Sequence, residues 1–391
     1  MSIESPRTAI VGLGMTEMGK VYGRTPTELA VDAITSACAD AGLALSDLDG
    51  LYVNPGVKND TDMRLQSTLG MRHTRVLATM QGFGSSAGQM VQYASMAIES
   101  GMAEAVACVY ADAPLKEGRS AGSAYPGQAR AMVGVGSLPF AAGLKAAPER
   151  YAVAARRHMH TYGTTSEQLG AVAVAARQWA AMNPAAQMRD PMTLEDHQSS
   201  RMIADPLRLL DCCLVSNGAV AVIVTSAERA ATLQQPPVHV WGWGQSHPGY
   251  VQRRDSEFGL VSGAAQSGPE ALKMAGVGVD EVDVREIYDC FTYTTLLTLE
   301  DYGFCGKGEG GEFVASGALA PGGSHPTNTG GGELSGYYMW GMTPLSEAVI
   351  QARGQAGERQ VDRRDVVMVS GNGGVLDFHS TLVLSPHQKG R

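Results

Sequence analysis

The sequence has few of the features that mark membrane, secreted or nucleic-acid-binding proteins. No apolar run approaches the ~18–20 residues that a membrane helix needs, and residues 1–6 lack the basic start and apolar stretch of a signal peptide. The six cysteines are scattered without a C-x-x-C pair, which argues against structural zinc and for reduced thiols in a cytoplasmic protein. With 30 Lys and Arg against 39 Asp and Glu, the net charge is −9, and no basic cluster stands out. We therefore expect neither a nucleic acid nor an anionic membrane as a partner.

Glycine and small apolar residues are abundant instead. The 391 residues include 48 glycines, and 44% of the chain is apolar, which is enough for a large core in two domains or two halves of one. Residues 41–49 (AGLALSDLD) parallel residues 275–283 (AGVGVDEVD), and each segment runs from a helix end into a strand. Strands and helices that alternate in two similar halves predict a duplicated α/β architecture, with halves at 1–230 and 236–391.

Capping and glycine signals predict the individual elements. Pro26 and Gly42 predict a helix over 25–41. The other expected elements are strands at 50–53, 103–110 and 365–370, helices at 90–99 and 344–352, and a buried strand at 207–226. Residues 112–205 form a long insertion with Ala- and Arg-rich helical segments, which we expect to form a cap over a site.

The first strand contains Gly12-Leu13-Gly14, which resembles a dinucleotide fingerprint only superficially. The third glycine is misplaced, and residues 19–23 have loop character where a helix should begin. No nucleotide cofactor is expected.

Two polar segments are the best candidates for chemistry. Residues 287–293 (IYDCFTY) stand at the end of an expected strand, and residues 328–344 (NTGGGELSGYYMWGMTP) contain three consecutive glycines. Such glycines imply a tight backbone path or close approach to a ligand. Tyrosines beside such a turn, facing a strand end, can form an acid/base site.

These segments resemble the thiolase superfamily, specifically the sterol-carrier-protein type of thiolase, and the resemblance covers nearly the whole chain. The family's H-D-C-F motif corresponds to residues 288–291 (YDCF), and its G-H-P-L-G motif corresponds to residues 337–341 (YYMWG). Both family histidines are therefore replaced, by Tyr288 and Tyr338. The resemblance implies a thiolase fold, which is a duplicated αβαβα five-layer architecture, here with a mostly helical cap insertion.

The nucleophilic cysteine of thiolases is also missing. That cysteine stands at the N-terminus of the helix after the first glycine turn, where the helix dipole lowers its pKa. A gapless count places Gly84 there, and a one-residue slip places Ser85 there. We interpret Ser85 and Ser86 as helix-capping residues.

A thiolase-like sequence that lacks the cysteine and both histidines resembles the thiolase-like aldolases of steroid side-chain degradation. The resemblance implies a retro-aldolase that cleaves a β-hydroxyacyl-CoA to a ketone and a shorter acyl-CoA, such as propionyl-CoA or acetyl-CoA, without an acyl-enzyme. We predict Tyr288 and Tyr338 as the acid/base pair and leave open which takes the hydroxyl proton. The candidates for the oxyanion hole and the pocket are Gly331, Gly332, Asn372, Gly373, Tyr293, His325, His379 and Ser85.

Two other functions are compatible with the same residues. A thiolase or acyltransferase with an unusual active site would use Cys290 or Ser85 as the nucleophile. A non-catalytic relative would only bind an acyl-CoA or a lipid.

The resemblance also implies partners. A homodimer through the first-half sheet is expected, together with a small subunit containing an OB-fold and a zinc ribbon, which would make a heterotetramer. No cofactor is expected in this chain beyond its CoA thioester substrate, and zinc, if present, would belong to the partner. No metal site is expected here, since His158 and His160 lie on different faces of a helix. Candidate partners for the CoA phosphates lie in the cap insertion at Arg150, Arg156, Arg157, Arg177 and Arg201.

Overall fold

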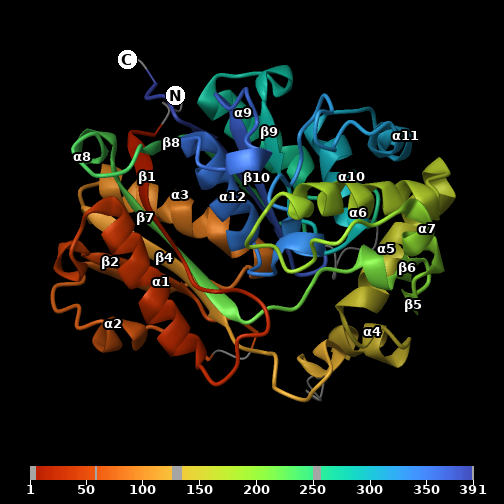
Figure 1. The fold of residues 1–391 in the computed structure, drawn as a ribbon, viewed down its shortest axis with the longest axis horizontal. Coiled ribbons are helices and arrows are strands. Elements are labelled where there is room, and N and C mark those ends of the chain that lie inside the picture. The colour runs from red at the N-terminus through yellow and green to blue at the C-terminus, as the bar shows by residue number, and fades with distance from the viewer. Residues whose placement is uncertain (1–5, 58–59, 126–133, 250–256, 390–391) are drawn as a thin grey trace.

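The computed structural model describes residues 6–57, 60–125, 134–249 and 257–389 (Figure 1). Within these residues, nine strands form one mixed sheet in the order β3-β2-β4-β7-β1-β8-β11-β10-β9. The strands of the first half are β1 (Thr8–Met15), β2 (Gly50–Asn54), β3 (Val76–Thr79), β4 (Ala105–Asp112) and β7 (Gly218–Ser226). Those of the second half are β8 (Val238–Ser246), β9 (Val284–Glu286), β10 (Val367–Gly373) and β11 (Phe378–Ser385).

The pairing pattern repeats between the halves. From the junction outward, β1-β7-β4-β2 pair antiparallel, antiparallel and parallel, and β8-β11-β10-β9 pair in the same sequence of directions. The halves meet where β1 pairs briefly with β8. The parallel between residues 41–49 and 275–283 is confirmed in the fold, because Gly42 and Gly276 both end their helices in the left-handed conformation. The chain is therefore a structural duplication.

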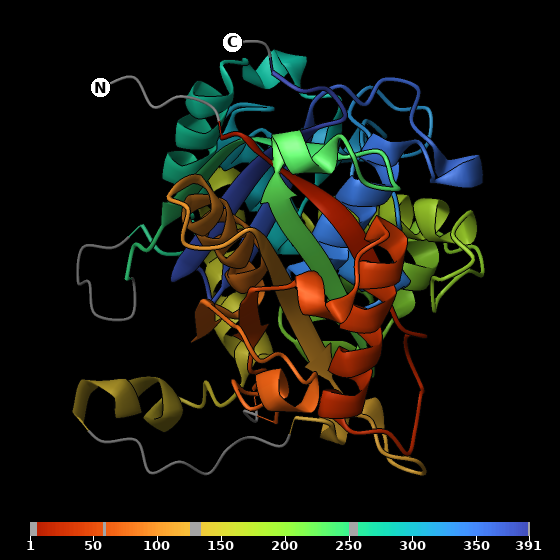
Figure 2. The same ribbon diagram turned by 90° about the vertical axis from the view of Figure 1, so that its left-hand side faces the viewer.

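Helices complete five layers. The helix α1 (Pro26–Ala41) covers the outer face of the first-half strands (Figure 2), and α9 (Ala264–Ala275) covers β8 and β11. Between the two sheet halves lie α3 (Ser86–Glu99) and α12 (Met342–Arg353), and each of them contacts strands of both halves. The expected five-layer fold is confirmed.

The paired glycines of β1 and β8 allow the outer helices to approach closely. A Cβ on Gly14 would lie 1.9 Å from the carbonyl oxygen of Ala33 in α1, and one on Gly244 would lie 2.2 Å from that of Ser267 in α9. Gly12 and Gly242 have the same role, with Cβ distances of 2.3 and 2.2 Å to helix carbonyl oxygens. The Gly-x-Gly of the first strand thus serves helix packing.

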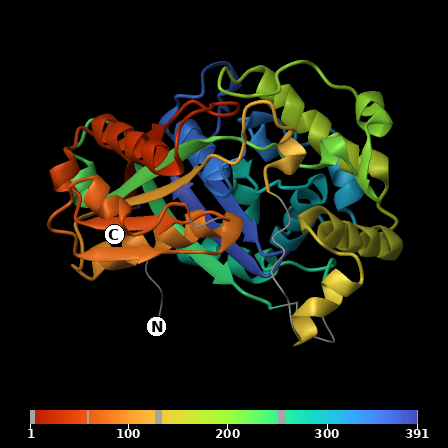
Figure 3. The ribbon, with the colours of Figure 1, turned by 90° about the horizontal axis from the view of Figure 1, so that it is seen from below.

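The insertion is mostly helical, as predicted. It contains α4 (Leu138–Ala141), α5 (Ala147–Tyr162), α6 (Ser166–Ala181) and α7 (Leu194–Ser199), followed by the short hairpin of β5 (Met202–Ala204) and β6 (Leu207–Arg208). The helices α5 and α6 lie against the second half, beside α10 (Thr292–Tyr302) and α11 (Gly310–Ala315), and far from α1 (Figure 3). The remaining short helices are α2 (Leu65–Thr68) and α8 (Ala227–Ala230).

The predicted strand at 207–226 is wrong in its first half. Residues 209–217 form a 3-10 turn and a loop, and the long strand begins only at Gly218. Asp211 holds this turn through its side chain, whose Oδ2 accepts a hydrogen bond from the Arg208 N–H of β6 at 2.7 Å. Its Oδ1 accepts hydrogen bonds from Thr292 Oγ1 at 2.6 Å and lies 2.8 Å from His197 Nε2.

Two structural absences concern the described residues. None of the helices placed in those residues is long and apolar enough to cross a membrane. Over the same residues, no group of three or more His, Cys, Asp or Glu side chains is arranged to hold a metal ion.

Candidate active site

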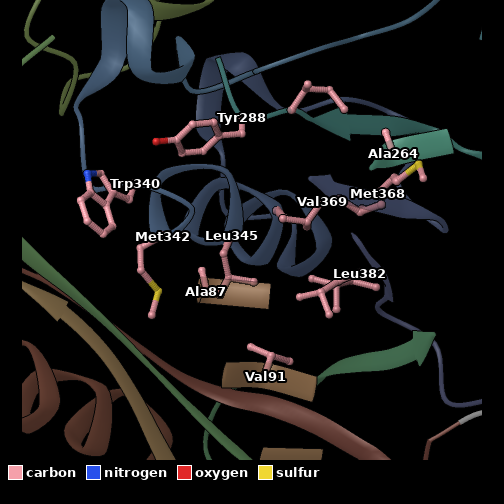
Figure 4. Packing of buried hydrophobic residues seen from close by; sticks show 14 of the residues in the cluster. Ala87, Val91, Ala264, Tyr288, Trp340, Met342, Leu345, Met368, Val369 and Leu382 are labelled. Atoms are coloured by element: carbon pink, nitrogen blue, oxygen red, sulfur yellow. The ribbon is translucent and has the colours of Figure 1, made fainter. Parts of the chain in front are cut away.

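The hydroxyl groups of Tyr288 and Tyr338 lie 3.4 Å apart. Tyr288 follows β9 and precedes α10, and Tyr338 stands between the π-helical turn η8 (Gly332–Gly336) and α12. Tyr288 is buried and Tyr338 is half-buried, so the pair connects the interior with a more exposed edge. Tyr288 belongs to the buried cluster between α3 and α12, with Trp340, Met342 and Leu345 (Figure 4). Two distant segments thus bring together the two predicted acid/base residues.

The ring of Tyr288 fills the space beside Gly84. A Cβ on Gly84 would lie 2.1 Å from Tyr288 Cε2, 2.3 Å from its Cζ and 2.3 Å from the backbone oxygen of Asn372. Contacts under 3.0 Å to a ring and to backbone require the structure to shift. Position 84, where the gapless count places the thiolase nucleophile, is therefore closed to any side chain.

Ser85 and Ser86 brace the turn before α3 instead of capping the helix. The hydroxyl of Ser85 donates to the carbonyl oxygen of Gly82 at 2.7 Å, and the Gly82 N–H donates to the hydroxyl of Ser86 at 2.7 Å. No helix N–H is bonded to the Ser85 side chain at the N-cap, so the capping interpretation is wrong for Ser85. Ser85 Oγ also accepts a hydrogen bond from Gln89 at 3.1 Å, which holds it away from nucleophilic chemistry.

Cysteine chemistry is also disfavoured. Burial and nearby Glu333 raise the pKa of the Cys290 thiol well above its ordinary value, and its sulfur lies 3.9 Å from Thr294 Oγ1. Burial and Cys290 raise the pKa of Cys213 in the same way. Because the thiolate is the nucleophile, thiols held protonated are inert in acyl transfer.

Both phenols are held protonated. Burial, followed by the carboxyl group of Glu333, raises the pKa of Tyr288 well above 10. Burial, followed by Cys213 and then Glu333, raises the pKa of Tyr338 in the same direction. A neutral phenol is a good donor to an enolate, but to act as a base it must pass its own proton to another group as it takes one.

Asp289 links segment 287–293 to segment 328–344 through hydrogen bonds. One carboxylate oxygen accepts from the Glu333 N–H at 2.7 Å, and the other lies 3.4 Å from the Leu334 nitrogen. A Cβ on Gly332 would lie 2.1 Å from this carboxylate, so only glycine permits the approach. Burial raises the pKa of Asp289 to about 7, against the lowering effect of these backbone donors. The three-glycine turn thus serves a buried carboxylate.

A second buried network supports the same turn from behind. Arg359 donates to the two carboxylate oxygens of Glu347 at 2.9 and 3.1 Å, and the hydroxyl of Thr329 donates to Glu286 at 2.7 Å and Glu347 at 3.0 Å. Burial and then Glu347 raise the pKa of Glu286. Arg359 therefore compensates two adjacent buried carboxyl groups, which together hold Thr329 just before the glycine turn.

Removal of that guanidinium should destabilise the protein strongly. We expect Arg359→Met to lower the free energy of unfolding by about 3–5 kcal/mol, because an uncompensated buried carboxylate remains. Denaturant unfolding measures this. The matched control is Arg363→Met, which removes a pair with Asp283 in which the arginine side chain is 80% exposed; its change should stay within about 1 kcal/mol. Equal effects in the two variants would contradict the assignment.

The other predicted residues are placed in different ways. Asn372 and Gly373 lie on β10 beside the Gly84 turn, and the side-chain nitrogen of Asn372 donates to the Tyr151 hydroxyl at 3.3 Å. Gly331 N–H donates to the Asn328 carbonyl at 2.8 Å and is therefore engaged within its own turn. The hydroxyl of Tyr293 donates to the Gly259 carbonyl at 2.7 Å. Their pocket or oxyanion roles stay predictions.

The two predicted histidines belong to other surroundings. His379 lies on β11, where its Nε2 is 3.1 Å from Tyr302 Oη and 3.2 Å from Ser370 Oγ. Burial lowers its pKa to about 3, so it is neutral in the fold. His325 packs against Phe313 and lines a cavity of about 600 Å³ whose lining residues include neither Tyr288 nor Tyr338.

Most of the candidate phosphate-binding arginines are engaged within the fold. Arg177 is buried and donates to Ser335 Oγ at 2.9 Å. Arg156 pairs with Asp205 at 2.5 Å, and Arg157 donates to the Phe258 carbonyl at 2.8 Å. Arg150 lies 5.7 Å from the Phe140 ring centre.

Sequence reasoning missed three side chains beside the tyrosine pair. Glu333 is fully buried with both carboxylate oxygens unbonded. Tyr151 reaches the site from α5 in the cap, and Tyr125 donates to buried Asp112 at 2.7 Å. The sequence could have pointed to Glu333, since a charged residue inside the glycine-rich motif GGGELSG is a candidate for a buried functional position. Nothing in the sequence pointed to the two tyrosines, because only the folded cap brings them near.

Comparison with characterised proteins places these features in context. The family description "Thiolase C-terminal domain-like" matches residues 242–386. A "Steroid side-chain-cleaving aldolase" from Thermomonospora curvata is 37% identical over 388 residues, covering 95% of this chain and 97% of that protein. A "17-hydroxy-3-oxo-4-pregnene-20-carboxyl-CoA lyase" from Mycobacterium tuberculosis is 37% identical over 383 residues, covering 94% and 97%.

Solved structures agree with the sequence relatives. The structure named "Ltp2-ChsH2(DUF35) aldolase" has 35% identity to this chain and a TM-score of 0.88, with both chains fully covered. Human mitochondrial 3-ketoacyl-CoA thiolase has 16% identity and a TM-score of 0.71 over 98% of this chain, which shows a shared fold.

Proposed function

Because this chain belongs to the thiolase superfamily, in the branch of thiolase-like steroid side-chain-cleaving aldolases, we propose that it cleaves a β-hydroxyacyl-CoA by a retro-aldol reaction with Tyr288 and Tyr338 as the acid/base pair. The enzyme is a carbon–carbon lyase that acts on CoA thioesters. The observation that carries the tyrosine assignment is the 3.4 Å contact between the two hydroxyls, at the positions of the thiolase histidines.

The chemistry follows from what the site contains. One phenol receives the β-hydroxyl proton while the bond between the α and β carbons breaks, and the other donates to the enolate oxygen of the thioester. The α carbon is then protonated, which gives a ketone and a shorter acyl-CoA. No acyl-enzyme forms, since the Gly84 position is closed and the Cys290 thiol is held protonated.

The proposed substrate class is a steroid CoA ester with a tertiary β-hydroxyl. In 17-hydroxy-3-oxo-4-pregnene-20-carboxyl-CoA, the compound named for the mycobacterial relative, the 17-hydroxyl is β to the thioester. Retro-aldol cleavage of that ester gives a 17-ketosteroid and propionyl-CoA.

The test is to incubate the purified chain, together with its co-purified partner, with this CoA ester. We expect equal amounts of 17-ketosteroid and propionyl-CoA by liquid chromatography with mass detection, and an unchanged intact mass of the quenched protein. An acylated protein would favour an unusual thiolase, and tight binding without cleavage would favour a non-catalytic acyl-CoA-binding protein.

The assembly is part of the same proposal. A two-component name, "Ltp2-ChsH2(DUF35) aldolase", supports a partner subunit. We propose that this partner is a small protein with an OB-fold and a zinc ribbon, which makes a heterotetramer around a homodimer of this chain. The homodimer is supported by the short edge strand β3 and by exposed apolar side chains on β3 and α3, namely Leu77, Tyr93 and Met96. Sedimentation of the chain alone should give a dimer.

A further inference from the structure

The carboxyl group of Glu333 is buried beside the tyrosine pair without a hydrogen-bond partner. Its exposure is 0%, and neither Oε1 nor Oε2 is bonded in the structure. Buried polar atoms of native proteins are nearly always paired, so an unpaired buried carboxyl group indicates a functional demand. Its backbone is fixed on both sides, because its N–H donates to Asp289 at 2.7 Å and its carbonyl accepts from the Leu214 N–H at 2.9 Å.

The titratable groups around Glu333 are mostly phenols and thiols, which are weaker acids than a carboxyl group. Glu333 acts electrostatically on groups from three loops, which are Tyr288, Asp289 and Cys290 after β9, Tyr338 before α12, and Cys213 before β7. A cation, Arg177 of α6, contacts the same turn through Ser335 rather than through Glu333. Asp289 accepts hydrogen bonds from backbone donors, whereas both carboxyl oxygens of Glu333 carry none.

We propose that Glu333 is the terminal proton acceptor of the tyrosine pair, a third member of the proton-transfer machinery; this inference rests on the retro-aldol function proposed above. A phenol that must be a base while it is held protonated needs a partner for its own proton. Glu333 lies five residues before Tyr338 and is anchored to the residue after Tyr288, and its carboxyl group acts electrostatically on both phenols.

The proton balance closes without any co-reactant. The β-hydroxyl proton passes to a tyrosine oxygen as that tyrosine's proton passes to Glu333. The electron pair left on the substrate oxygen forms the ketone, the bond between the α and β carbons breaks, and its pair moves onto the thioester as an enolate. The α carbon then takes the proton back along the same route, so Glu333 ends as a carboxylate and nothing is oxidised or reduced.

The signature of this role is a variant that loses activity without losing stability. Burial raises the pKa of Glu333 well above 4.5. A carboxyl group whose folded pKa is raised stabilises the fold below its unfolded pKa, and this contribution is lost as pH rises through the folded pKa. Glu333→Gln escapes that loss, so its melting temperature at pH 8 should equal or exceed that of the wild type.

The experiment compares Glu333→Gln, Glu333→Asp and wild type in complex with the co-purified partner, using 17-hydroxy-3-oxo-4-pregnene-20-carboxyl-CoA. We expect the kcat/KM of the wild type to rise with pH along a limb well above pH 4.5. In Glu333→Gln, kcat should fall about 10–100-fold with little change in KM and without this limb, while Glu333→Asp keeps the limb at an intermediate rate. The matched control is Glu286→Gln, at a buried carboxyl group bonded to Thr329, and it should keep the pH limb of the wild type.

The outcomes separate the two proposals. If wild type cleaves the ester and Glu333→Gln matches its rate and pH profile, the role of Glu333 is refuted and the retro-aldol function stands. If Glu333→Gln loses activity only together with a lowered melting temperature, and Glu333→Asp does not keep the limb, Glu333 is structural and the inference fails. If wild type cleaves nothing, both proposals fall.

Discussion

Tyr288→Phe and Tyr338→Phe are each expected to lower kcat/KM for ester cleavage by about 10²–10⁴-fold, the range of a positioned acid or base. The loss of a hydroxyl leaves the ring volumes in place, so both variants should fold. Steady-state kinetics with detection of the ketone product measures the effect. Because the hydroxyls are 3.4 Å apart and act in one relay, the double variant should be little worse than either single variant.

Tyr337 is the matched control for this pair. It is adjacent to Tyr338 in sequence and buried, but its hydroxyl lies 2.7 Å from Ser346 Oγ on α12. Tyr337→Phe should therefore cost about 0.5–1.5 kcal/mol of stability and leave cleavage near the wild-type rate. Near-normal turnover in Tyr288→Phe and Tyr338→Phe would remove the tyrosine assignment and leave the family membership intact.

Isotope exchange isolates the enolate half of the reaction. Incubating propionyl-CoA in heavy water tests only this half, because no β-hydroxyl is present. The α carbon exchanges its proton along the route that serves the β-hydroxyl, and the other phenol donates to the enolate oxygen, so Tyr288→Phe and Tyr338→Phe should both slow the exchange. Exchange at the wild-type rate in either variant would remove that phenol from the enolate half.

The sequence predicted the parts of this structure that local patterns encode. The repeat at 41–49 and 275–283 follows from glycines that end helices in the left-handed conformation, and both glycines do so. Tyr288 and Tyr338 came from motif positions within two continuous segments. The strand error at 209–217 arose because apolar content there resembles a strand, whereas Asp211 makes long-range bonds with His197 and Thr292 that no local pattern encodes.

The parts of the site that depend on three-dimensional contact could not be predicted from the sequence in the same way. Glu333 stood in the motif, but its importance depends on complete burial without a partner, which only the fold creates. Gly84 was found by counting along the chain, yet its meaning depends on the Tyr288 ring some 200 residues away in sequence. Gly84 and Tyr288 are therefore coupled in this fold, because the tyrosine ring occupies the space that a side chain at position 84 would need.

Gly84→Ala tests that coupling directly and is expected to damage both activity and stability. The new methyl group would meet the Tyr288 ring at 2.1 Å and the Asn372 carbonyl at 2.3 Å. Overpacking of this kind costs about 1–3 kcal/mol, and a ring displaced by about 1 Å lowers the rate by about 10²-fold. Denaturant unfolding and steady-state cleavage measure the two effects.

A control variant and a double variant show whether the effect of Gly84→Ala comes from the clash with the Tyr288 ring. Gly122→Ala adds the same methyl group where nothing lies within 4 Å, so it should be neutral in both measurements. In a Tyr288→Ala background, the stability cost of Gly84→Ala should shrink but not vanish, because the clash with the Asn372 carbonyl remains. An equal cost in both backgrounds would show that the backbone contact alone excludes a side chain. In that case the ring of Tyr288 could not be the reason that this chain carries glycine at position 84.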